Sequence, residues 1–202
     1  GNGQDPHTYS PTPSALARIE RAALLVLTGL GFEPWLAGIA RGRSPSKTLI
    51  LGQRARGRTT AAGHPAPHVW LDLSNTRAWV QACAGQLALL AKPHAPLFQQ
   101  RALALDSRLE ALDRWTRGRL AALPAERRRA LLFHEAMGYF GEAYGVHFES
   151  VAGLSTAEEV GSRRVAELVD RIRRGELVAI FPEQNEDERM LRTIANEAGK
   201  PL

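Results

Sequence analysis

The stretch from Pro96 to Leu123 constrains the fold of this chain more than any other segment. After Pro96 it contains no further proline, and its leucines recur at helical spacing at Leu105, Leu109 and Leu112. At 1.5 Å per residue such a helix would be roughly 40 Å long. This is long for a small domain, so we interpret it as a rigid connection between two lobes. One long surface helix of a single domain is the alternative.

Short apolar runs alternate with amphipathic helical stretches on both sides of this helix. The expected strands are the runs LLVL, TLIL, ALLF, VHFESVAG and VAIF, at residues 24–27, 48–51, 130–133, 146–153 and 178–181. The expected helices cover about 13–22, 35–41, 74–92, 135–144, 157–174 and 187–198, and a loop covers 52–67. Strands that alternate with helices favour α/β lobes with mainly parallel sheets.

This alternation divides the chain into three parts. We expect an N-terminal α/β lobe at residues 1–95, the linking helix at 96–123 and a C-terminal α/β lobe at 124–202. The pattern starts without an opening strand and stops just after a helix. We therefore expect the first lobe to lack its first strand and helix, and the second to lack its last strands.

Composition and charge exclude several classes of protein. No window is long and apolar enough for a transmembrane helix. The only cysteine, Cys83, excludes an internal disulfide framework and a thiolate-rich zinc site. The net charge of +5 is small, and the arginines of the expected helices are mixed with glutamates and aspartates, so they indicate a solvated surface and argue against nucleic-acid binding.

Polar side chains follow two of the expected strands in the C-terminal half. His134 comes directly after the run at 130–133, and Glu183 follows the run at 178–181 and Pro182. Ligands of open α/β sheets bind outside the carboxyl ends of the strands. Both residues are therefore candidate ligands, although His134 also fits a hydrogen-bonded core histidine and Glu183 fits a partner of Arg189.

Two further histidines of the N-terminal half lie in proline-flanked loops. His7 follows Pro6 and His68 follows Pro67, and a preceding proline limits the backbone freedom of the ligand. Three imidazoles with a carboxylate or water form an ordinary zinc site. His64, in the expected loop, is a candidate fifth ligand or metal-loading residue. A surface histidine is the ordinary alternative in each case.

Motifs of other chemistries are absent from the sequence. His134-Glu135 begins like the HExxH of zinc proteases, but Gly138 stands where the second histidine would be. The chain contains neither a GxxxxGK[ST] phosphate loop nor a GxSxG nucleophile turn.

Four segments, in order, resemble the signature segments of one family. They are DPHTYSPTPS at 5–14, GLGFEPWL at 29–36, PHVWLD at 67–72 and FHEAMGYF at 133–140. Together they resemble the metal-binding substrate-binding proteins of bacterial zinc and manganese ABC transporters. The resemblance covers nearly the whole chain. It implies two α/β lobes joined by one long rigid helix, with a metal in the cleft between them.

The resemblance also implies a set of ligands. The family's first three ligand positions fall on His7, His68 and His134, and histidine at the third position is typical of zinc-type members. The segment around His64 resembles a much reduced form of their histidine-rich loop. The family's fourth ligand lies beyond the last residue of this chain, and Glu183 is a candidate substitute. Ala66 stands where the family usually has an aspartate that supports its neighbours.

The function implied is high-affinity capture of zinc for delivery to the membrane permease of an ABC importer, without enzymatic activity. The expected location is the periplasm, or a lipid-anchored position outside the cytoplasmic membrane. A manganese receptor of the same family and a zinc metallochaperone or docking module are alternatives. A zinc-dependent hydrolase, with Glu135 or Glu183 as base, is a further alternative.

Overall fold

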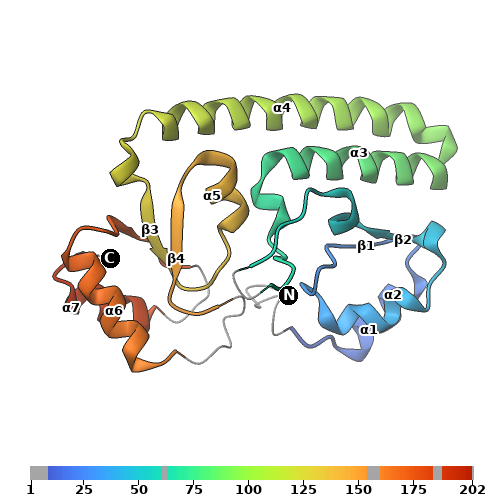
Figure 1. Cartoon of the computed structure of the whole chain (residues 1–202). Helices are drawn as coiled ribbons and strands as arrows, with labels where there is room; N and C mark the ends of the chain where they lie inside the picture. Colours follow the sequence, from blue (N-terminus) through green and yellow to red (C-terminus); the bar gives the residue numbers. More distant parts are fainter. Residues whose placement is uncertain (1–8, 61–62, 154–159, 184–187, 202) are drawn as a thin grey trace. The chain divides into compact units, whose positions relative to one another are not determined.

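The structure, a computed structural model, describes residues 9–60, 63–153, 160–183 and 188–201. It divides into two compact units, Pro6–Trp115 and a second that includes Thr116–Leu202. Each unit holds a parallel β-sheet with α-helices (Figure 1). The predicted fold class, α/β with mainly parallel sheets and a long helix, is confirmed.

The first unit contains α1 (Pro13–Arg21), β1 (Leu25–Leu27), α2 (Ala37–Arg41), β2 (Thr48–Ile50) and α3 (Leu73–Leu90). Its short 3-10 helices are η1 (Pro34–Leu36), η2 (Pro45–Lys47), η3 (Leu51–Arg54), η4 (Val69–Leu71) and η5 (Lys92–His94). Strands β1 and β2 pair in parallel, with Leu25 opposite Thr48. Leu25, Leu27 and Leu36 are the buried core of this sheet.

Local chemistry explains where α1 begins and ends. Thr12 accepts a hydrogen bond from the backbone N–H of Ala15 through its Oγ1, at 3.2 Å, and a proline occupies the first turn. At the other end, the guanidinium group of Arg43 donates to the carbonyl oxygens of Ile19 and Ala22. These bonds satisfy carbonyl groups that a helix end leaves without an intrahelical partner.

The long helix predicted for residues 96–123 is α4 (Ala95–Ala121), the long upper helix in Figure 1. Asp106 on α4 receives a bidentate ion pair from Arg77 on α3, with Nε–Oδ1 and Nη2–Oδ2 distances of 2.8 and 2.9 Å. The leucine spacing predicted the helix correctly. It did not predict which leucines are buried, since Leu105 and Leu112 are 41% and 46% exposed.

The second unit contains β3 (Arg129–Leu132), α5 (Gly138–Tyr144), β4 (His147–Ser150), α6 (Ser162–Arg173), β5 (Ala179–Ile180) and α7 (Arg189–Glu197), with the 3-10 helix η6 (Ala125–Arg127). Its strand order is β4-β3-β5, and both pairings are parallel. The core lies between this sheet and helices α6 and α7. Leu131, Leu168, Ile172 and Ile194 are each at most 1% exposed there.

The helix predicted at 135–144 begins later than expected, because α5 starts at Gly138. The backbone N–H groups of Phe133, His134 and Glu135 all bond outside any helix, to Glu183 and to the carbonyl oxygen of Gly153. These contacts come from residues distant in sequence and hold the segment open as a loop.

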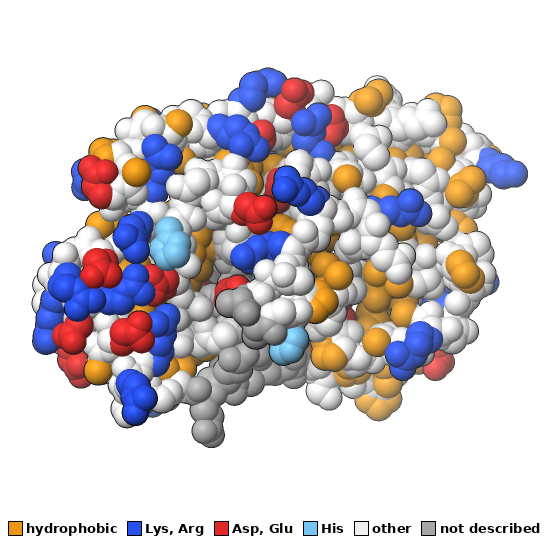
Figure 2. Space-filling model, in the orientation of Figure 1, with side chains coloured by type: hydrophobic (Ala, Val, Ile, Leu, Met, Phe, Trp, Pro, Cys, Tyr) orange, Lys and Arg blue, Asp and Glu red, His pale blue; other side chains and the backbone are white. Residues whose placement is uncertain are grey.

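Several arginines of α6 pair with acidic side chains, as the mixed-charge pattern predicts. Arg171 pairs with Glu149 and Glu176, while Arg164 contacts Glu149 and Glu167. Blue and red side chains are accordingly interspersed on the face shown in Figure 2. This distribution is typical of a solvated protein surface rather than a nucleic-acid interface.

Candidate metal centre

His134 and Glu183 lie together at the carboxyl ends of neighbouring strands. His134 follows β3 and Glu183 follows β5, and these two strands are paired in parallel. The imidazole Nδ1 of His134 hydrogen-bonds to Oε2 of the Glu183 carboxylate. The side chains are 10% and 20% exposed, so the pair is largely shielded from water. The parallel topology therefore brings two of the predicted site residues into contact.

The other oxygen of Glu183 is also engaged. Its Oε1 accepts hydrogen bonds from the backbone N–H groups of Phe133 at 3.1 Å and His134 at 3.0 Å. Burial alone would raise the pKa of Glu183, but the hydrogen bonds from the His134 ring and from these backbone groups outweigh it, so the net pKa lies below its ordinary value. The side chain is therefore a carboxylate fixed in position.

A fixed carboxylate at Nδ1 determines the chemistry of the imidazole. A carboxylate only accepts hydrogen bonds, so the ring donates its Nδ1–H, and the neutral ring then carries its lone pair on Nε2. Metal-ligating histidines are commonly held in this way by a carboxylate on the second ring nitrogen. The geometry therefore prepares His134 to bind a metal through Nε2.

His68 is the corresponding buried histidine of the first unit, at 4% exposure. Its ring is in edge-on contact with Phe32 and Trp70, with centroid distances of 5.9 and 5.5 Å. Phe32 lies in the loop after β1, and Trp70 lies in η4. Two aromatic rings thus pack against this imidazole and restrict its orientation.

The first turn of α3 holds the segment that follows His68. The side-chain amide of Asn75 donates to the carbonyl oxygens of Val69 and Arg56, each at 3.2 Å, and Thr76 Oγ1 donates to the Trp70 carbonyl oxygen at 2.7 Å. The helix expected from about residue 74 begins at Leu73. Asp72 is the cap, because its side chain accepts from the N–H of Ser74.

The other two histidines of the predicted set are His64 and His7. His64 is exposed, and its backbone exchanges hydrogen bonds with Thr60. His7 lies outside the described residues. Within the described ranges, no three His, Cys, Asp or Glu side chains form a metal-binding group. The structure thus brings together His134 and Glu183 from the predicted ligands, and the full set stays a prediction.

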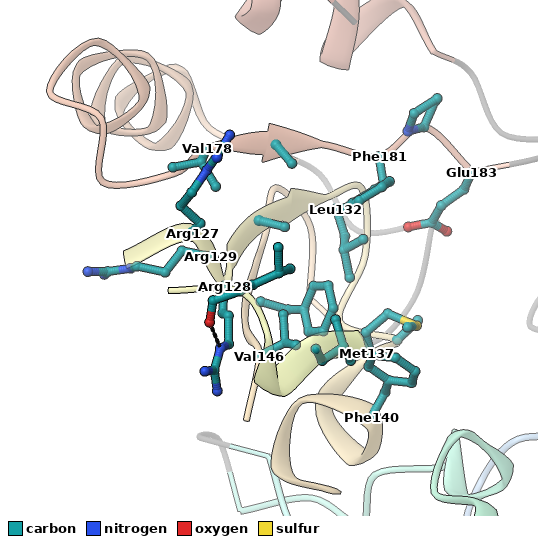
Figure 3. A pocket seen from close by; sticks show the side chains of 17 residues that line it. Arg127, Arg128, Arg129, Leu132, Met137, Phe140, Val146, Val178, Phe181 and Glu183 are labelled. Carbon is teal, nitrogen blue, oxygen red and sulfur yellow. Dashed lines mark hydrogen bonds between the residues drawn. The ribbon is translucent and has the colours of Figure 1, made fainter. Parts of the chain in front are cut away.

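A pocket of about 790 Å³ lies beside the same strands in the second unit (Figure 3). Leu132, Phe140 and Phe181 line it, and Glu183 stands at one end while arginines stand at the other. Its walls are mainly hydrocarbon and offer few of the nitrogen, oxygen or sulfur donors that a metal ion requires. The lining of this pocket therefore does not favour a metal ion.

Two α/β units, a long helix and a buried histidine in each unit agree with the metal-binding substrate-binding proteins of ABC transporters that the sequence resembles. The whole chain, residues 1–202, matches the family model described as ZnuA, zinc-uptake complex component A, periplasmic. The chain belongs to this family. The description is that of an uptake component and not of an enzyme, in agreement with the sequence prediction.

Similar proteins are named for the binding of different metals. The zinc-binding protein TroA of Treponema pallidum is 32% identical over 192 residues, which are 92% of this chain and 61% of TroA. The manganese-binding lipoprotein MntA of Halalkalibacterium halodurans is 26% identical over 198 residues, which are 98% of this chain and 66% of MntA. The chain thus spans slightly less than two thirds of the length of these curated relatives.

Solved structures show the same fold. The periplasmic zinc-binding protein TroA from Treponema pallidum superimposes with a TM-score of 0.90 at 28% identity, covering 98% of this chain and 73% of that structure. Fe(III)-bound YtgA from Chlamydia trachomatis gives a TM-score of 0.88 at 25% identity, covering 100% of this chain and 76% of that structure. Metal binding is common to these neighbours, and the metal differs between them.

The family is extracytoplasmic, since its description names a periplasmic component and relatives such as MntA are named as lipoproteins. This agrees with the predicted location. No helix in the described part of the chain combines the length and the hydropathy that a membrane crossing requires.

Proposed function

We propose that this protein captures one zinc ion and delivers it to the membrane permease of an ABC importer. The observation that carries the proposal is the His134–Glu183 pair, in which a carboxylate fixes the imidazole with its lone pair on Nε2. In this proposal His7, His68 and His134 bind the ion, as the family resemblance implies.

Glu183 acts through His134 in this proposal. Both of its oxygens already accept hydrogen bonds from Phe133 and His134. Oε1 accepts two of these bonds and Oε2 accepts one, so a lone pair of Oε2 is the only acceptor position of the carboxylate that these bonds leave for a metal ion. In this proposal the fourth ligand is a water molecule or another residue, and Glu183 is the group that orients His134. The exposed His64 is accessible to incoming metal, and its role in loading stays a prediction.

The donor set supports zinc over manganese. Imidazole nitrogens suit zinc, whereas manganese prefers sites richer in carboxylate and water oxygens. Three histidines therefore favour zinc, although relatives named for either metal match the chain. Cys83 is not included in the proposed donor set, and burial raises the pKa of its thiol.

A competition titration of the purified chain against a chromophoric chelator tests the proposal. We expect one zinc ion per chain with a submicromolar Kd, and weaker binding of manganese. Tighter binding of manganese would make this a manganese receptor of the same family. If neither metal bound, the capture function would be wrong for this chain.

The role of Glu183 is tested by Glu183→Gln. An amide has one accepting oxygen, so it cannot satisfy both the two backbone N–H groups and the Nδ1–H of His134. We expect zinc binding to weaken by about 10- to 100-fold, as for other partners that orient a metal ligand. The matched control is Glu197→Gln, an exposed position on α7, which should bind zinc like the parent. Equal affinity in both variants would contradict the role of Glu183.

A further inference from the structure

The loop after β1 has a backbone that needs external support. Gly29, Leu30 and Gly31 follow one another with φ angles of 74°, 56° and 83°. Glycine adopts positive φ at little cost, but Leu30 is not a glycine, and a side chain in this region is strained. Such a conformation persists only when the surrounding structure holds it.

Glu33 provides one half of that support. Its two carboxylate oxygens accept hydrogen bonds from the backbone N–H groups of Thr28 at 2.9 Å and Gly29 at 3.0 Å. Because the acceptor is ionised, these bonds are stronger than neutral ones. They tie the end of the loop back to the end of β1.

Gly52, just after β2, provides the other half. Its N–H donates to the carbonyl oxygen of Thr28 at 2.8 Å. A Cβ atom at this position would lie 2.7 Å from the same oxygen and 2.8 Å from the Leu30 side chain. The close approach requires glycine, and it packs the loop against the neighbouring strand end.

The contacts of Glu33 and Gly52 hold the loop, and the loop positions Phe32. Its ring lies edge-on to the His68 imidazole at 5.9 Å and to Trp70 at 4.8 Å, at angles of 75° and 64°. Trp70 in turn contacts His68 at 5.5 Å and 71°. The imidazole of His68 therefore packs against two rings that also pack against each other, which restricts its rotation.

We propose that Phe32, held in place by Glu33, is a positioning residue that orients the imidazole of His68 for metal binding. The proposal rests on the proposed function of His68 as a ligand. The second unit offers a parallel: Glu183 accepts from Phe133 and His134 N–H groups at the end of β3, as Glu33 does from Thr28 and Gly29 at the end of β1. In this proposal the hydrogen bond from Glu183 orients His134, and aromatic packing contributes to the orientation of His68.

The test uses Phe32→Leu, which removes the aromatic edge, with Phe148→Leu of the second unit as the matched control. The first readout is the ring-nitrogen NMR signature of His68 in the metal-free protein. We expect the variant to show averaged or broadened ring signals, whereas the control retains the parent signature. Unchanged His68 signals in Phe32→Leu would overturn the proposal. Phe32→Tyr keeps the ring and should restore the parent signature.

The second readout is zinc affinity. We expect Phe32→Leu to bind zinc about 10-fold more weakly than the parent, at the lower end of the range for groups that orient a ligand. Glu33→Gln should weaken binding in the same direction, whereas Glu20→Gln, which removes a charge from an exposed position of α1, should not. Parent-like affinity in both Phe32→Leu and Glu33→Gln would overturn the proposal.

These readouts separate two kinds of failure. If the parent binds no zinc, the proposed function is wrong, yet the NMR signature of His68 still decides whether Phe32 orients its ring. If the parent binds zinc and His68→Ala binds it equally well, His68 is not a ligand, and the proposed positioning for metal binding is wrong with it.

Discussion

Replacing His134 by alanine is expected to weaken zinc binding by more than about 100-fold. Groups that only orient a metal ligand are worth about 10- to 100-fold in affinity, so a direct ligand should exceed that range. The substitution also leaves the fold supported, because Glu183 keeps its two bonds from the backbone N–H groups at 133 and 134. Competition against a chelator of known zinc affinity measures the change.

The matched control for this substitution is His147→Ala. His147 lies on β4 of the same unit, is exposed and contacts Glu149, and the family resemblance gives it no ligand role. It should bind zinc like the parent. Thermal unfolding of both variants without metal shows whether any loss reflects the fold. Parent-like zinc affinity in a folded His134→Ala protein would remove His134 from the site.

The contact between His134 and Glu183 was predictable only in part. Each residue follows an apolar run, and parallel strands place their carboxyl ends at one edge of a sheet, so proximity follows from the pattern. The hydrogen bonds do not, because they join residues 49 and 50 positions apart. Sequence spacing therefore indicated Glu183 as a candidate ligand, and only the three-dimensional contacts show that it hydrogen-bonds to His134.

The same distinction between local and distant contacts applies to the helices. The start of α1 is encoded locally by Thr12 and Pro13, and it was predicted. The start of α5 was wrong because Glu183 and Gly153 bind the backbone of residues 133–135. A pattern of apolar residues does not indicate hydrogen-bond partners that are distant in the sequence.

The support of His68 was missed although a signal was present. Two glycines around Leu30 indicate a loop with positive φ angles, and a glutamate two positions after the second glycine is a ready acceptor for the N–H groups of a strand end. The sequence could thus have indicated that a glutamate fixes the conformation of this loop. It could not have shown that Phe32 faces His68, because the two residues lie 36 positions apart, with several turns between them.

Replacing Leu131 by alanine is expected to lower the free energy of unfolding of the second unit by about 2–5 kcal/mol. Leu131 is 0% exposed at the centre of β3, and it packs against buried side chains of α6 and α7 such as Leu168 and Ile194. Truncation removes buried hydrocarbon and leaves a cavity that the neighbouring side chains cannot fill without moving. The loss is a large part of the stability of an ordinary domain.

Denaturant unfolding followed by two probes measures this loss. All four tryptophans, Trp35, Trp70, Trp79 and Trp115, lie in the first unit, so their fluorescence reports that unit, while circular dichroism reports helices of both.

The matched control is Leu89→Ala on α3, where the side chain is 69% exposed and the change should stay within about 0.5 kcal/mol. A Leu131→Ala protein as stable as this control would show that the sheet and helices α6 and α7 do not share one close-packed core. A shift confined to the dichroism would show that the second unit unfolds separately from the first, whereas an equal shift of the tryptophan signal would show that the two units unfold together.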